Sequence, residues 1–310
     1  MNDNEIPILL IIFNRPDKIK RLVESLTKIK PKHVYVTGDG PRAYKPNEEI
    51  KCQEARAIAT NLPWQCEIHT NFSDSNLGCK RGVSSGVTWF FNNVEKGIIL
   101  EDDCLPNPAF FSFCNDMFKK YQNEDRVMHI NGTSFLSKTG LSTNLPYYFS
   151  SITHSWGWAT WKRSWLNFDF EMQNIEDLEK RFSKTSPFKE HKHTQYWIKL
   201  FKHTKEKARD SWAVPWAYSV MYANGVCITP TVNLIENIGF DDAATHTTKA
   251  SNYNLPISDL FIPTSNEKKN ITPSKDFDSA VTEKIFMVSI KRRIILLLEK
   301  WYNSLNTSKL

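Results

Sequence analysis

The sequence predicts an α/β protein built on a parallel, doubly wound sheet, and three observations support this prediction. Strand and helix patterns alternate as βαβαβαβ over the first hundred residues, an order that favours a parallel sheet with right-handed crossovers. The run Ile98-Ile99-Leu100 is apolar on both faces, as in a buried parallel strand. The length of 310 residues is enough for one large α/β domain or two smaller ones.

Short apolar runs separated by turn residues mark the strands of the first hundred residues. Strands are expected over residues 6–13, 33–37, 66–70 and 97–100. The stretches between them carry apolar residues at helical spacing, and Pro16 stands where a first helical residue would. Helices are therefore expected after Pro16, over 47–60 and over 77–94.

The second half differs in composition, because most of the tryptophans lie there. A helix is expected over 110–121 and a strand over 127–131. Trp158, Trp161 and Trp165 recur at i, i+3 and i+7, which predicts one helix face, with Trp161 and Trp165 in the core. We expect residues 1–253 to form the main domain, in halves 1–125 and 126–253. A linker and a C-terminal helix are expected over 254–310.

Charge and composition exclude several classes of function. The 40 basic and 34 acidic residues give a net charge of +6 without a dense basic stripe, so nucleic-acid binding is not expected. The six cysteines form no Cys-x-x-Cys pair, and no apolar run approaches the roughly 18 residues of a membrane span. The first residues lack the basic flank of a signal peptide. These features predict a cytoplasmic protein.

The most informative motif is Glu101-Asp102-Asp103, which directly follows the apolar run 97–100. Three adjacent carboxylates repel one another, and a fold that gathers them at a strand end bears an electrostatic cost. A hard cation such as Mg²⁺ or Mn²⁺ relieves that cost, since it prefers carboxylates, phosphate oxygens and water. Ligands of open α/β sheets bind beyond the carboxyl ends of the strands. The motif therefore predicts a metal–nucleotide site, with an acidic surface turn as the alternative.

Four segments resemble, in order and spacing, those of bacterial GT-A glycosyltransferases. They are Phe-Asn-Arg-Pro at 13–16, Thr-Gly-Asp-Gly-Pro-Arg at 37–42, Asn-Leu-Gly-Cys-Lys-Arg-Gly at 76–82 and Glu-Asp-Asp at 101–103. The chain is similar to family 2-type sugar transferases and, in layout, to the N-acetylglucosaminyltransferase that opens hybrid N-glycan synthesis. The resemblance covers roughly residues 6–250. It implies a Rossmann-like GT-A fold with a mostly parallel doubly wound sheet, an acceptor-binding second half and a C-terminal helical tail.

The resemblance implies a donor site at the ends of the first strands. Arg15 would bind the donor diphosphate, for which a guanidinium fork is suited, and Asp39 would accept a hydrogen bond from the uracil ring. Lys80 and Arg81, at a helix start, would add positive charge for the diphosphate. The alternatives are an exposed arginine, a turn aspartate and a solvated helix face.

The resemblance also implies roles for the acids. Asp103 matches the direct metal ligand, Asp102 would face the donor ribose or sugar, and Glu101 would orient its neighbours. Asp210 lies where the similar enzyme has its general base, which takes the proton of the attacking acceptor hydroxyl. Asp210 could instead cap a helix that starts at the next residue, and Glu206 is a weaker rival for the base.

Three aromatic residues complete the expected site. Trp156 or Trp158, in a Gly-Trp segment that resembles one beside the donor sugar, would line the pocket and face sugar C–H surfaces. His246 stands where many relatives place a C-terminal metal histidine. A purely structural role is the alternative for each.

Together the motifs and the resemblance predict a glycosyltransferase that depends on Mn²⁺ or Mg²⁺, and the resemblance implies inversion at the anomeric carbon. It would move a hexosyl or N-acetylhexosaminyl group from a UDP-sugar to a glycan or glycolipid hydroxyl in bacterial surface polysaccharide synthesis. A sugar-phosphate nucleotidylyltransferase is one rival, but residues 14–16 lack the glycine-rich loop of such enzymes. A non-catalytic carbohydrate-binding protein on a transferase scaffold is the other.

The C-terminal segment suggests a further partner. Lys291, Arg292 and Arg293 adjoin the apolar run 294–298, inside a helix expected over 281–302. Such a helix can lie on an anionic membrane surface, here at the inner face of the membrane. The alternative is that its apolar side packs on the catalytic domain or on a second subunit, as in a homodimer.

Overall fold

A computed structural model describes residues 2–239, 255–258 and 270–287. Its strands are β1 (Ile8–Ile12), β2 (His33–Gly38), β3 (Glu67–Phe72), β4 (Lys96–Glu101), β5 (Cys104–Pro106), β6 (Val127–Asn131), β7 (Tyr147–Ser150), β8 (Trp158–Trp161), β9 (Val226–Pro230) and β10 (Ile235–Asn237). Eight of them form one sheet in the order β3-β2-β1-β4-β8-β6-β9-β7, and β5 pairs with β10 in a separate ribbon. The fold is a Rossmann-like mixed α/β fold, as the sequence predicts.

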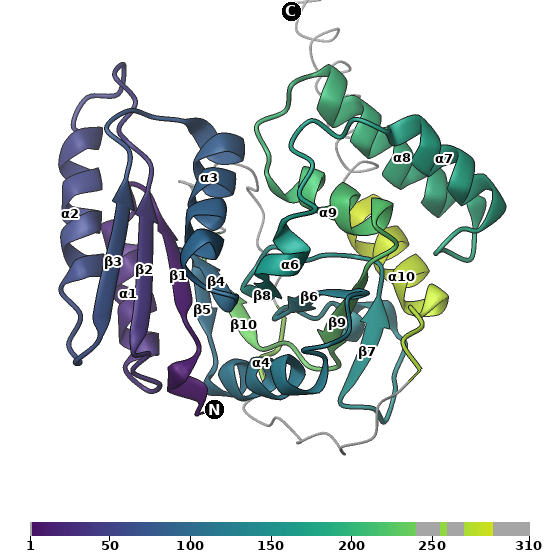
Figure 1. Ribbon diagram of the computed structural model, residues 1–310, viewed down its shortest axis with the longest axis horizontal. Coiled ribbons are helices and arrows are strands. Elements are labelled where there is room, and N and C mark those ends of the chain that lie inside the picture. The colour runs from purple at the N-terminus through teal and green to yellow at the C-terminus, as the bar shows by residue number, and fades with distance from the viewer. Residues whose placement is uncertain (1, 240–254, 259–269, 288–310) are drawn as a thin grey trace, which may run out of the picture.

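The helices lie on both sides of this sheet (Figure 1). They are α1 (Pro16–Leu26), α2 (Glu48–Thr60), α3 (Gly78–Asn93), α4 (Pro108–Lys120), α5 (Leu136–Thr139), α6 (Lys162–Trp165), α7 (Ile175–Lys184), α8 (His191–Glu206), α9 (Ala213–Tyr222) and α10 (Lys275–Val281), with a 3-10 turn at Asp3–Glu5 and a π-helix, η3, at Thr282–Met287. The strands and helices expected in the first hundred residues are all confirmed. None of the helices in the described ranges is long and apolar enough to cross a membrane, and all six cysteines are free.

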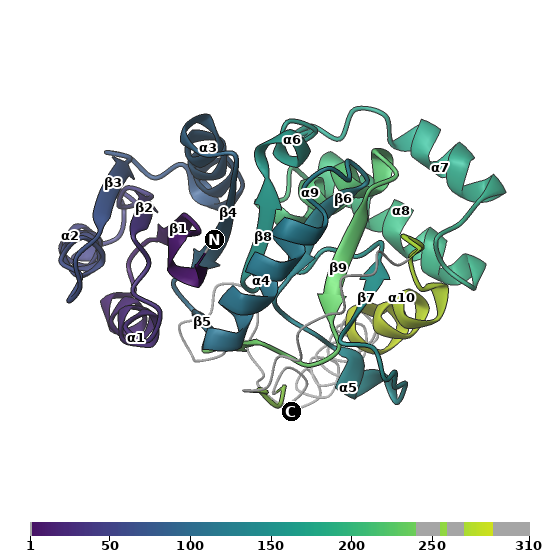
Figure 2. The same cartoon turned by 60° about the horizontal axis from the view of Figure 1, so that its bottom comes forward.

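Strand β1 shows why the sheet is covered on both faces. Ile8, Leu10 and Ile12 pack in one core with side chains of α1, α2 and α4. Leu9, which points the other way, packs with Phe90 of α3 in a second core that also includes α9. Figure 2 shows α1 and α3 on opposite sides of the strands. Because β1, β2 and β4 pair in parallel and are buried on both faces, their apolar runs are nearly continuous, whereas β3 at the sheet edge is more exposed and more polar.

The tryptophan stripe is where the predicted secondary structure is wrong. Trp158 and Trp161 lie in strand β8, which runs antiparallel between β4 and β6, and Trp165 ends the short helix α6. Strand alternation sends Trp158 to the α3 and α9 side of the sheet and Trp161 to the α4 side, where it packs edge-on against Phe118. The core positions of Trp161 and Trp165 are nevertheless confirmed, since both are buried.

The helix α4 and the strand β6 confirm the elements expected over 110–121 and 127–131.

The chain after β10 is described only in part. The segment α10–η3 packs on α8: Lys189 N donates to Ser279 Oγ at 2.8 Å and Trp197 Nε1 donates to Thr282 Oγ1 at 3.1 Å. The remainder of the expected C-terminal helix, with its basic residues 291–293, lies outside the described residues. The domain boundaries stay a prediction.

Candidate active site at the ends of β1 and β4

The strand order changes direction beside β1. The chain passes from β1 to β2 and β3 on one side, and then returns to place β4 on the other side of β1. The loops that leave β1 and β4 therefore diverge, and ligands of doubly wound sheets bind in the crevice that results. In the β1–β4 pairing Ile11 lies opposite Glu101. The segment after β1 thus begins beside the acid cluster, by which we mean Glu101, Asp102 and Asp103.

Arg15 binds two of the three carboxylates of the acid cluster. Its Nε donates to Asp102 Oδ2 at 3.1 Å, its Nη2 donates to Asp102 Oδ1, and its Nη1 donates to Asp103 Oδ2 at 3.0 Å. The planar guanidinium suits this two-pronged contact. Pro16 begins α1 directly afterwards, so the backbone of Arg15 is held at a helix start. Three of the five N–H donors of the guanidinium are used, and two are left for another ligand.

Burial and mutual repulsion raise the pKa values of two of the three acids, Glu101 and Asp102. Burial, and then the charges of Asp103 and Asp102, raise the pKa of Glu101 to about 8, although the Trp212 indole donates a hydrogen bond to it. Burial raises the pKa of Asp102 to about 6, against the opposing effect of Arg15. The protonated and ionised forms of these acids are therefore close in free energy near neutral pH.

Lys18 is a member of this site that the sequence did not reveal. It lies in the first turn of α1, is only 3% exposed, and its charge favours the ionised form of Asp102. A lysine on an otherwise amphipathic helix is usually solvated, and nothing in the sequence distinguished this one from the other lysines of α1.

Asp103 is the more accessible of the two acids that Arg15 binds. Its side chain is 17% exposed, against 3% for Asp102. The ribbon of β5 and β10 fixes its backbone, because Ile238 N donates to Asp103 O at 2.9 Å. Gly239 passes so close that an added Cβ would lie 2.3 Å from Asp103 Oδ2. A glycine at this position therefore leaves the carboxylate room to bind a ligand.

The acid cluster suits a hard divalent cation. Among the described residues, its three carboxylates interact with the guanidinium of Arg15 and the ammonium of Lys18. The acids would keep a net negative charge if all were ionised, and the raised pKa values of Glu101 and Asp102 reflect their burial together with that repulsion. The side-chain donor atoms are carboxylate oxygens, the ligands that Mg²⁺ and Mn²⁺ prefer.

Two further acids meet at the start of α3. Asp39 accepts hydrogen bonds from Leu77 N at 2.8 Å and Gly78 N at 3.0 Å. Asp210 accepts from Cys79 N at 2.9 Å and Lys80 N at 2.6 Å. The N–H groups at a helix start have no partner within the helix, and these two carboxylates bind four successive ones. We call Asp39 and Asp210 the cap pair.

These contacts bear on the roles expected for the cap pair. Asp210 caps α3 and not the helix that follows it, since α9 begins at Ala213. Asp39 also accepts from Gly40 N and from the side chain of Asn76. These hydrogen bonds hold the start of α3 in place, which is a structural role. The contact of Asp39 with uracil and the role of Asp210 as a base stay predictions.

Cys79 joins the acid cluster to the cap pair. Burial raises the pKa of its thiol to about 12, and the nearby charges of Glu101 and Asp210 act in the same direction. Trp212, two residues after Asp210, donates to Glu101. The segment 210–212 of the second half therefore supplies one acid of the cap pair, Asp210, and contacts the acid cluster through Trp212.

The other expected site residues are spread more widely. Lys80 lies over the ring of Phe170, with 3.9 Å from Nζ to the ring centroid, and Arg81 is exposed. Trp156 is partly exposed beside Phe135. Trp158 is fully buried, stacked on Trp212 and on a histidine of β6, so the expectation that it lines a sugar pocket is wrong. His246 lies outside the described residues.

A buried acid at the start of α2, close to the loop after β1, also had no signal in the sequence. Glu48, at the start of α2, accepts from Asn14 Nδ2 at 2.8 Å and from Arg42 N at 2.7 Å, and it pairs with the Arg42 guanidinium. The hydrogen bond from Arg42 holds the pKa of Glu48 down at about 2. This network ties the loop after β1 to the loop after β2 and so positions Arg15, the neighbour of Asn14.

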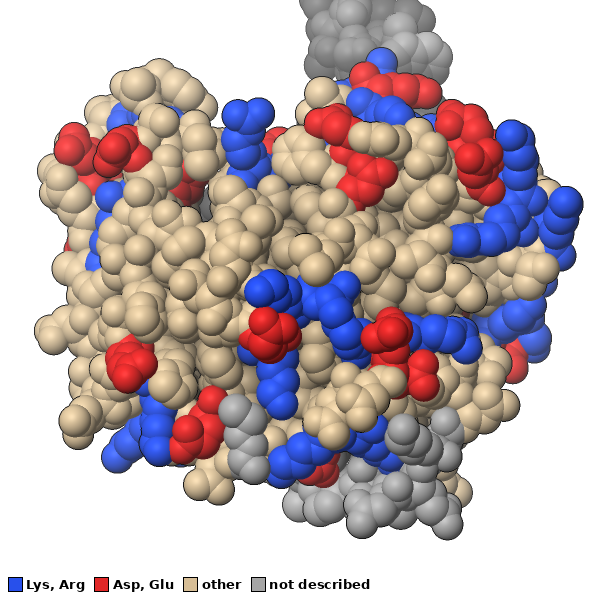
Figure 3. Space-filling model, viewed as in Figure 1, with Lys and Arg blue, Asp and Glu red and all other residues tan. Residues whose placement is uncertain are grey.

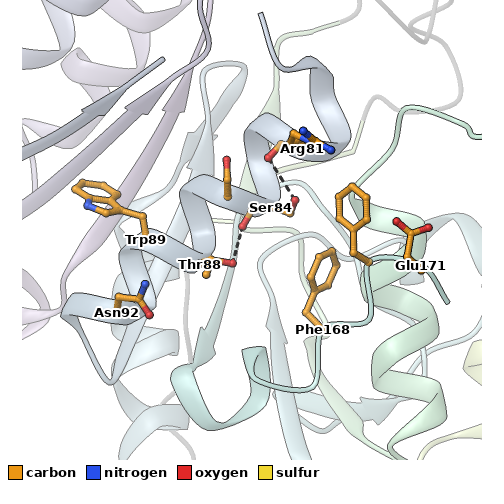
Figure 4. A pocket seen from close by; sticks show the side chains of 9 residues that line it. Arg81, Ser84, Thr88, Trp89, Asn92, Phe168 and Glu171 are labelled. Atoms are coloured by element: carbon orange, nitrogen blue, oxygen red, sulfur yellow. Dashed lines mark hydrogen bonds between the residues drawn. The ribbon is translucent and has the colours of Figure 1, made fainter. Parts of the chain in front are cut away.

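An open groove of about 600 Å³ runs along α3 (Figure 4). Its lining combines aromatic rings with hydroxyl, amide and charged groups: Arg81, Ser84, Ser85, Thr88, Trp89, Asn92, Phe168, Phe170 and Glu171. One wall is α3 and the other is the segment that follows α6. Figure 3 shows that the surrounding face mixes basic and acidic side chains, without a stripe of one sign.

Solved structures with a related arrangement of elements are distant from this chain. A UDP-glucose pyrophosphorylase complexed with UDP-glucose matches with a TM-score of 0.38 and 10% identity, over 75% of this chain and 91% of that one. A 4-diphosphocytidyl-2C-methyl-D-erythritol synthase from Anaerococcus prevotii matches with a TM-score of 0.30 and 8% identity, over 71% and 97%. An apo UDP-glucose pyrophosphorylase gives 0.30 and 11%, over 70% and 97%.

No protein-family model matches the chain, and neither does any curated protein. The likeness to the solved structures is one of fold alone, and nothing about activity follows from it.

Proposed function

We propose that this chain is a metal-dependent glycosyltransferase that moves a sugar from a nucleotide diphosphate donor, UDP-linked, to a hydroxyl of a glycan or glycolipid. One observation carries the proposal. The acid cluster and Arg15 lie together where the strand order reverses, so a cation site and a phosphate-binding guanidinium share one crevice. A nucleotide diphosphate bound with a divalent cation needs both.

Asp103 and Asp102 would hold Mn²⁺ or Mg²⁺, with Asp103 as the accessible ligand. The cation, when bound, offsets the negative charge that develops on the departing diphosphate. Glu101 is fixed by its hydrogen bond from Trp212 and maintains the arrangement of its two neighbours.

Arg15 would bind the diphosphate. Two of its N–H donors are free of the acid cluster, and a guanidinium matches the geometry of phosphate oxygens. Its contacts with Asp102 and Asp103 orient it before the donor arrives, which lowers the entropic cost of binding.

Asp210 is the proposed general base. It is exposed, and each of its oxygens accepts one backbone hydrogen bond. A carboxylate oxygen has a second lone pair, so Asp210 can accept the proton of an acceptor hydroxyl while still capping α3. Attack by that hydroxyl at the anomeric carbon, opposite the departing diphosphate, inverts the configuration there.

The groove along α3 is the proposed acceptor site. Aromatic rings pack against the C–H faces of sugars, and hydroxyl and amide groups bind sugar hydroxyls. The groove begins one turn into α3, at Arg81, and a helix rises about 1.5 Å per residue. The stretch from Arg81 to Asn92 is therefore on the order of 16 Å long, enough for several sugar units.

The deciding experiment is a survey of nucleotide sugars with Mn²⁺, in which released UDP is measured with and without added glycans. The proposal expects UDP release that needs Mn²⁺ and rises with an acceptor. Formation of UTP from UDP-sugar and pyrophosphate would identify a nucleotidylyltransferase instead. Binding without any release would indicate a carbohydrate-binding protein.

The acceptor site has its own test. Phe170→Ala should raise the KM for the acceptor while the KM for the donor stays unchanged. Leu166→Ala is the matched control, because Leu166 is 78% exposed and lies outside the groove lining. Equal acceptor KM values in the two variants would remove the groove from the proposal.

A further inference from the structure

A second group of potential metal ligands lies far along the chain from the acid cluster. Glu190 precedes α8, His193 is in its first turn, and Glu283 is in η3. One ligand atom from each of the three residues lies within 4.8 Å of the others. The spacing of Glu190 and His193 is i, i+3, which puts both on one face at the helix start. Glu283 comes from the segment that packs on α8.

His193 is the unusual member of this group. It is 1% exposed, and neither ring nitrogen has a hydrogen-bond partner among the described residues. Its Nε2 lies 3.6 Å from Glu283 Oε2, too far for a hydrogen bond. Buried polar groups are nearly always satisfied, so an imidazole nitrogen that faces a carboxylate across this gap is suited to a bound cation.

Lys192 takes the place of a cation in the structure. Its Nζ lies 3.0 Å from Glu190 Oε2 and 3.0 Å from Glu283 Oε1. Hydrogen bonds to Glu283 and then Glu190 raise the pKa of Lys192. The ammonium shows that the two carboxylates converge on one positive charge, and its flexible, partly exposed side chain can move away.

We infer that Glu190, His193 and Glu283 form a site for a divalent first-row transition ion of the Zn²⁺ type. An imidazole nitrogen and carboxylate oxygens are both ligands of Zn²⁺, and three protein ligands leave the fourth tetrahedral position to water. A nitrogen ligand disfavours Mg²⁺ and Ca²⁺, which take oxygen. This site therefore differs in ion preference from the acid cluster and does not depend on the proposed transferase activity.

The site has a structural consequence. Glu190 and His193 belong to α8, whereas Glu283 lies about 90 residues later in η3. An ion bound by all three residues would fasten the segment α10–η3 to α8, in addition to the hydrogen bonds from Lys189 and Trp197. Because such an ion binds only the folded arrangement, it raises the apparent stability of the protein.

The test is a Zn²⁺ titration of the full chain in excess Mg²⁺, followed by calorimetry and by thermal unfolding. The Mg²⁺ fills the acid cluster, and the same titration in Asp103→Asn checks that the cluster contributes nothing. We expect one Zn²⁺ per chain and a rise in Tm in both proteins. Zn²⁺ binding that disappears in Asp103→Asn would overturn the inference.

Substitutions separate a metal site from an ion-pair network. Glu283→Gln and His193→Gln should weaken Zn²⁺ binding at least about tenfold, since even the partners that orient metal ligands cost that much when lost. Lys192→Met should strengthen binding a few-fold, because it removes the competing ammonium. Glu179→Gln, which breaks an exposed ion pair between Glu179 of α7 and Lys202 of α8, is the matched control. Unchanged binding in Glu283→Gln, or weaker binding in Lys192→Met, would contradict the site.

Discussion

The acid cluster, at the end of β4, and the cap pair, at the start of α3, are both groups of carboxylates, but their charges are balanced in different ways. The cap pair is balanced by backbone, since four successive N–H groups of α3 bind its oxygens. The acid cluster is balanced only in part, by side-chain cations, and burial together with the charges of its two neighbours raises the pKa of Glu101 to about 8. Carboxylates that the fold satisfies internally have a structural role, and carboxylates that it leaves short of positive charge are suited to bind a cation.

The largest expected effect comes from Asp103→Asn. The amide is nearly isosteric but uncharged, so it coordinates a hard cation poorly. Mn²⁺-dependent donor binding and turnover should both be lost, while the fold is kept. Donor binding can be measured by titration with UDP and Mn²⁺, and Asp74→Asn, an exposed acid outside both groups, serves as control. An Asp103→Asn protein that binds UDP and Mn²⁺ like the parent would exclude the metal role.

The next effect tests whether a member of the cap pair has a second role. If Asp210 is the base, Asp210→Asn should lower turnover by about 10² to 10⁴-fold with donor affinity nearly unchanged. Its role as a cap predicts in addition a loss of about 1 kcal/mol in the free energy of unfolding, because the amide nitrogen of asparagine cannot accept one of the two backbone hydrogen bonds. Steady-state kinetics and urea unfolding of one variant measure both. Lower stability with normal turnover would leave Asp210 a cap alone and return attention to Glu206.

A third pair of variants compares the two groups directly. Arg15→Gln removes the guanidinium that binds Asp102 and should destabilise the protein by about 1 to 3 kcal/mol, the usual cost of a buried charged partner. Asp39→Asn should cost about 1 kcal/mol, because the amide nitrogen of asparagine cannot accept one of the two hydrogen bonds from the start of α3. Mn²⁺ should restore part of the stability in Arg15→Gln and none of the loss in Asp39→Asn, as urea unfolding with and without Mn²⁺ would show. Equal rescue of both variants would remove the distinction between the groups.

The sequence was most informative where periodicity and turn residues agree. The first seven elements follow apolar runs bounded by proline, glycine and asparagine, so their positions are correct to within one or two residues. The helix predicted from Trp158, Trp161 and Trp165 was wrong because the spacing i, i+3 fits one face of a helix as well as two opposite faces of a strand. Strand β8 pairs antiparallel with β4, and that partner lies about 60 residues earlier. No local pattern reveals such a pairing.

The residues of the candidate site could likewise be predicted only where a local sequence pattern places them. Arg15 and the acid cluster could be placed together because both directly follow strands that pair in parallel. The hydrogen bonds of Asp210 to α3 span 130 residues of chain, and the burial of Lys18 depends on tertiary packing. Neither has a sequence signal, because both depend on how distant segments meet.

The smallest expected effect is on the pH dependence of stability. Glu101 and Asp102 have folded-state pKa values of about 8 and about 6, above their ordinary values of 4.5 and 3.8. Between those limits the folded state binds more protons than the unfolded state, so the free energy of unfolding decreases as pH rises. Without divalent cation, stability should therefore fall from about pH 5 to pH 8. Mn²⁺ should offset this fall increasingly at higher pH, because its binding displaces the protons.

Urea unfolding along a pH series, with and without Mn²⁺, measures both trends. Glu101→Gln should flatten the slope of stability against pH above about pH 6. The cap pair offers the contrast, since Asp39→Asn should leave the effect of Mn²⁺ on this slope intact. A stability that rises toward pH 8 without cation would contradict the raised pKa values of Glu101 and Asp102.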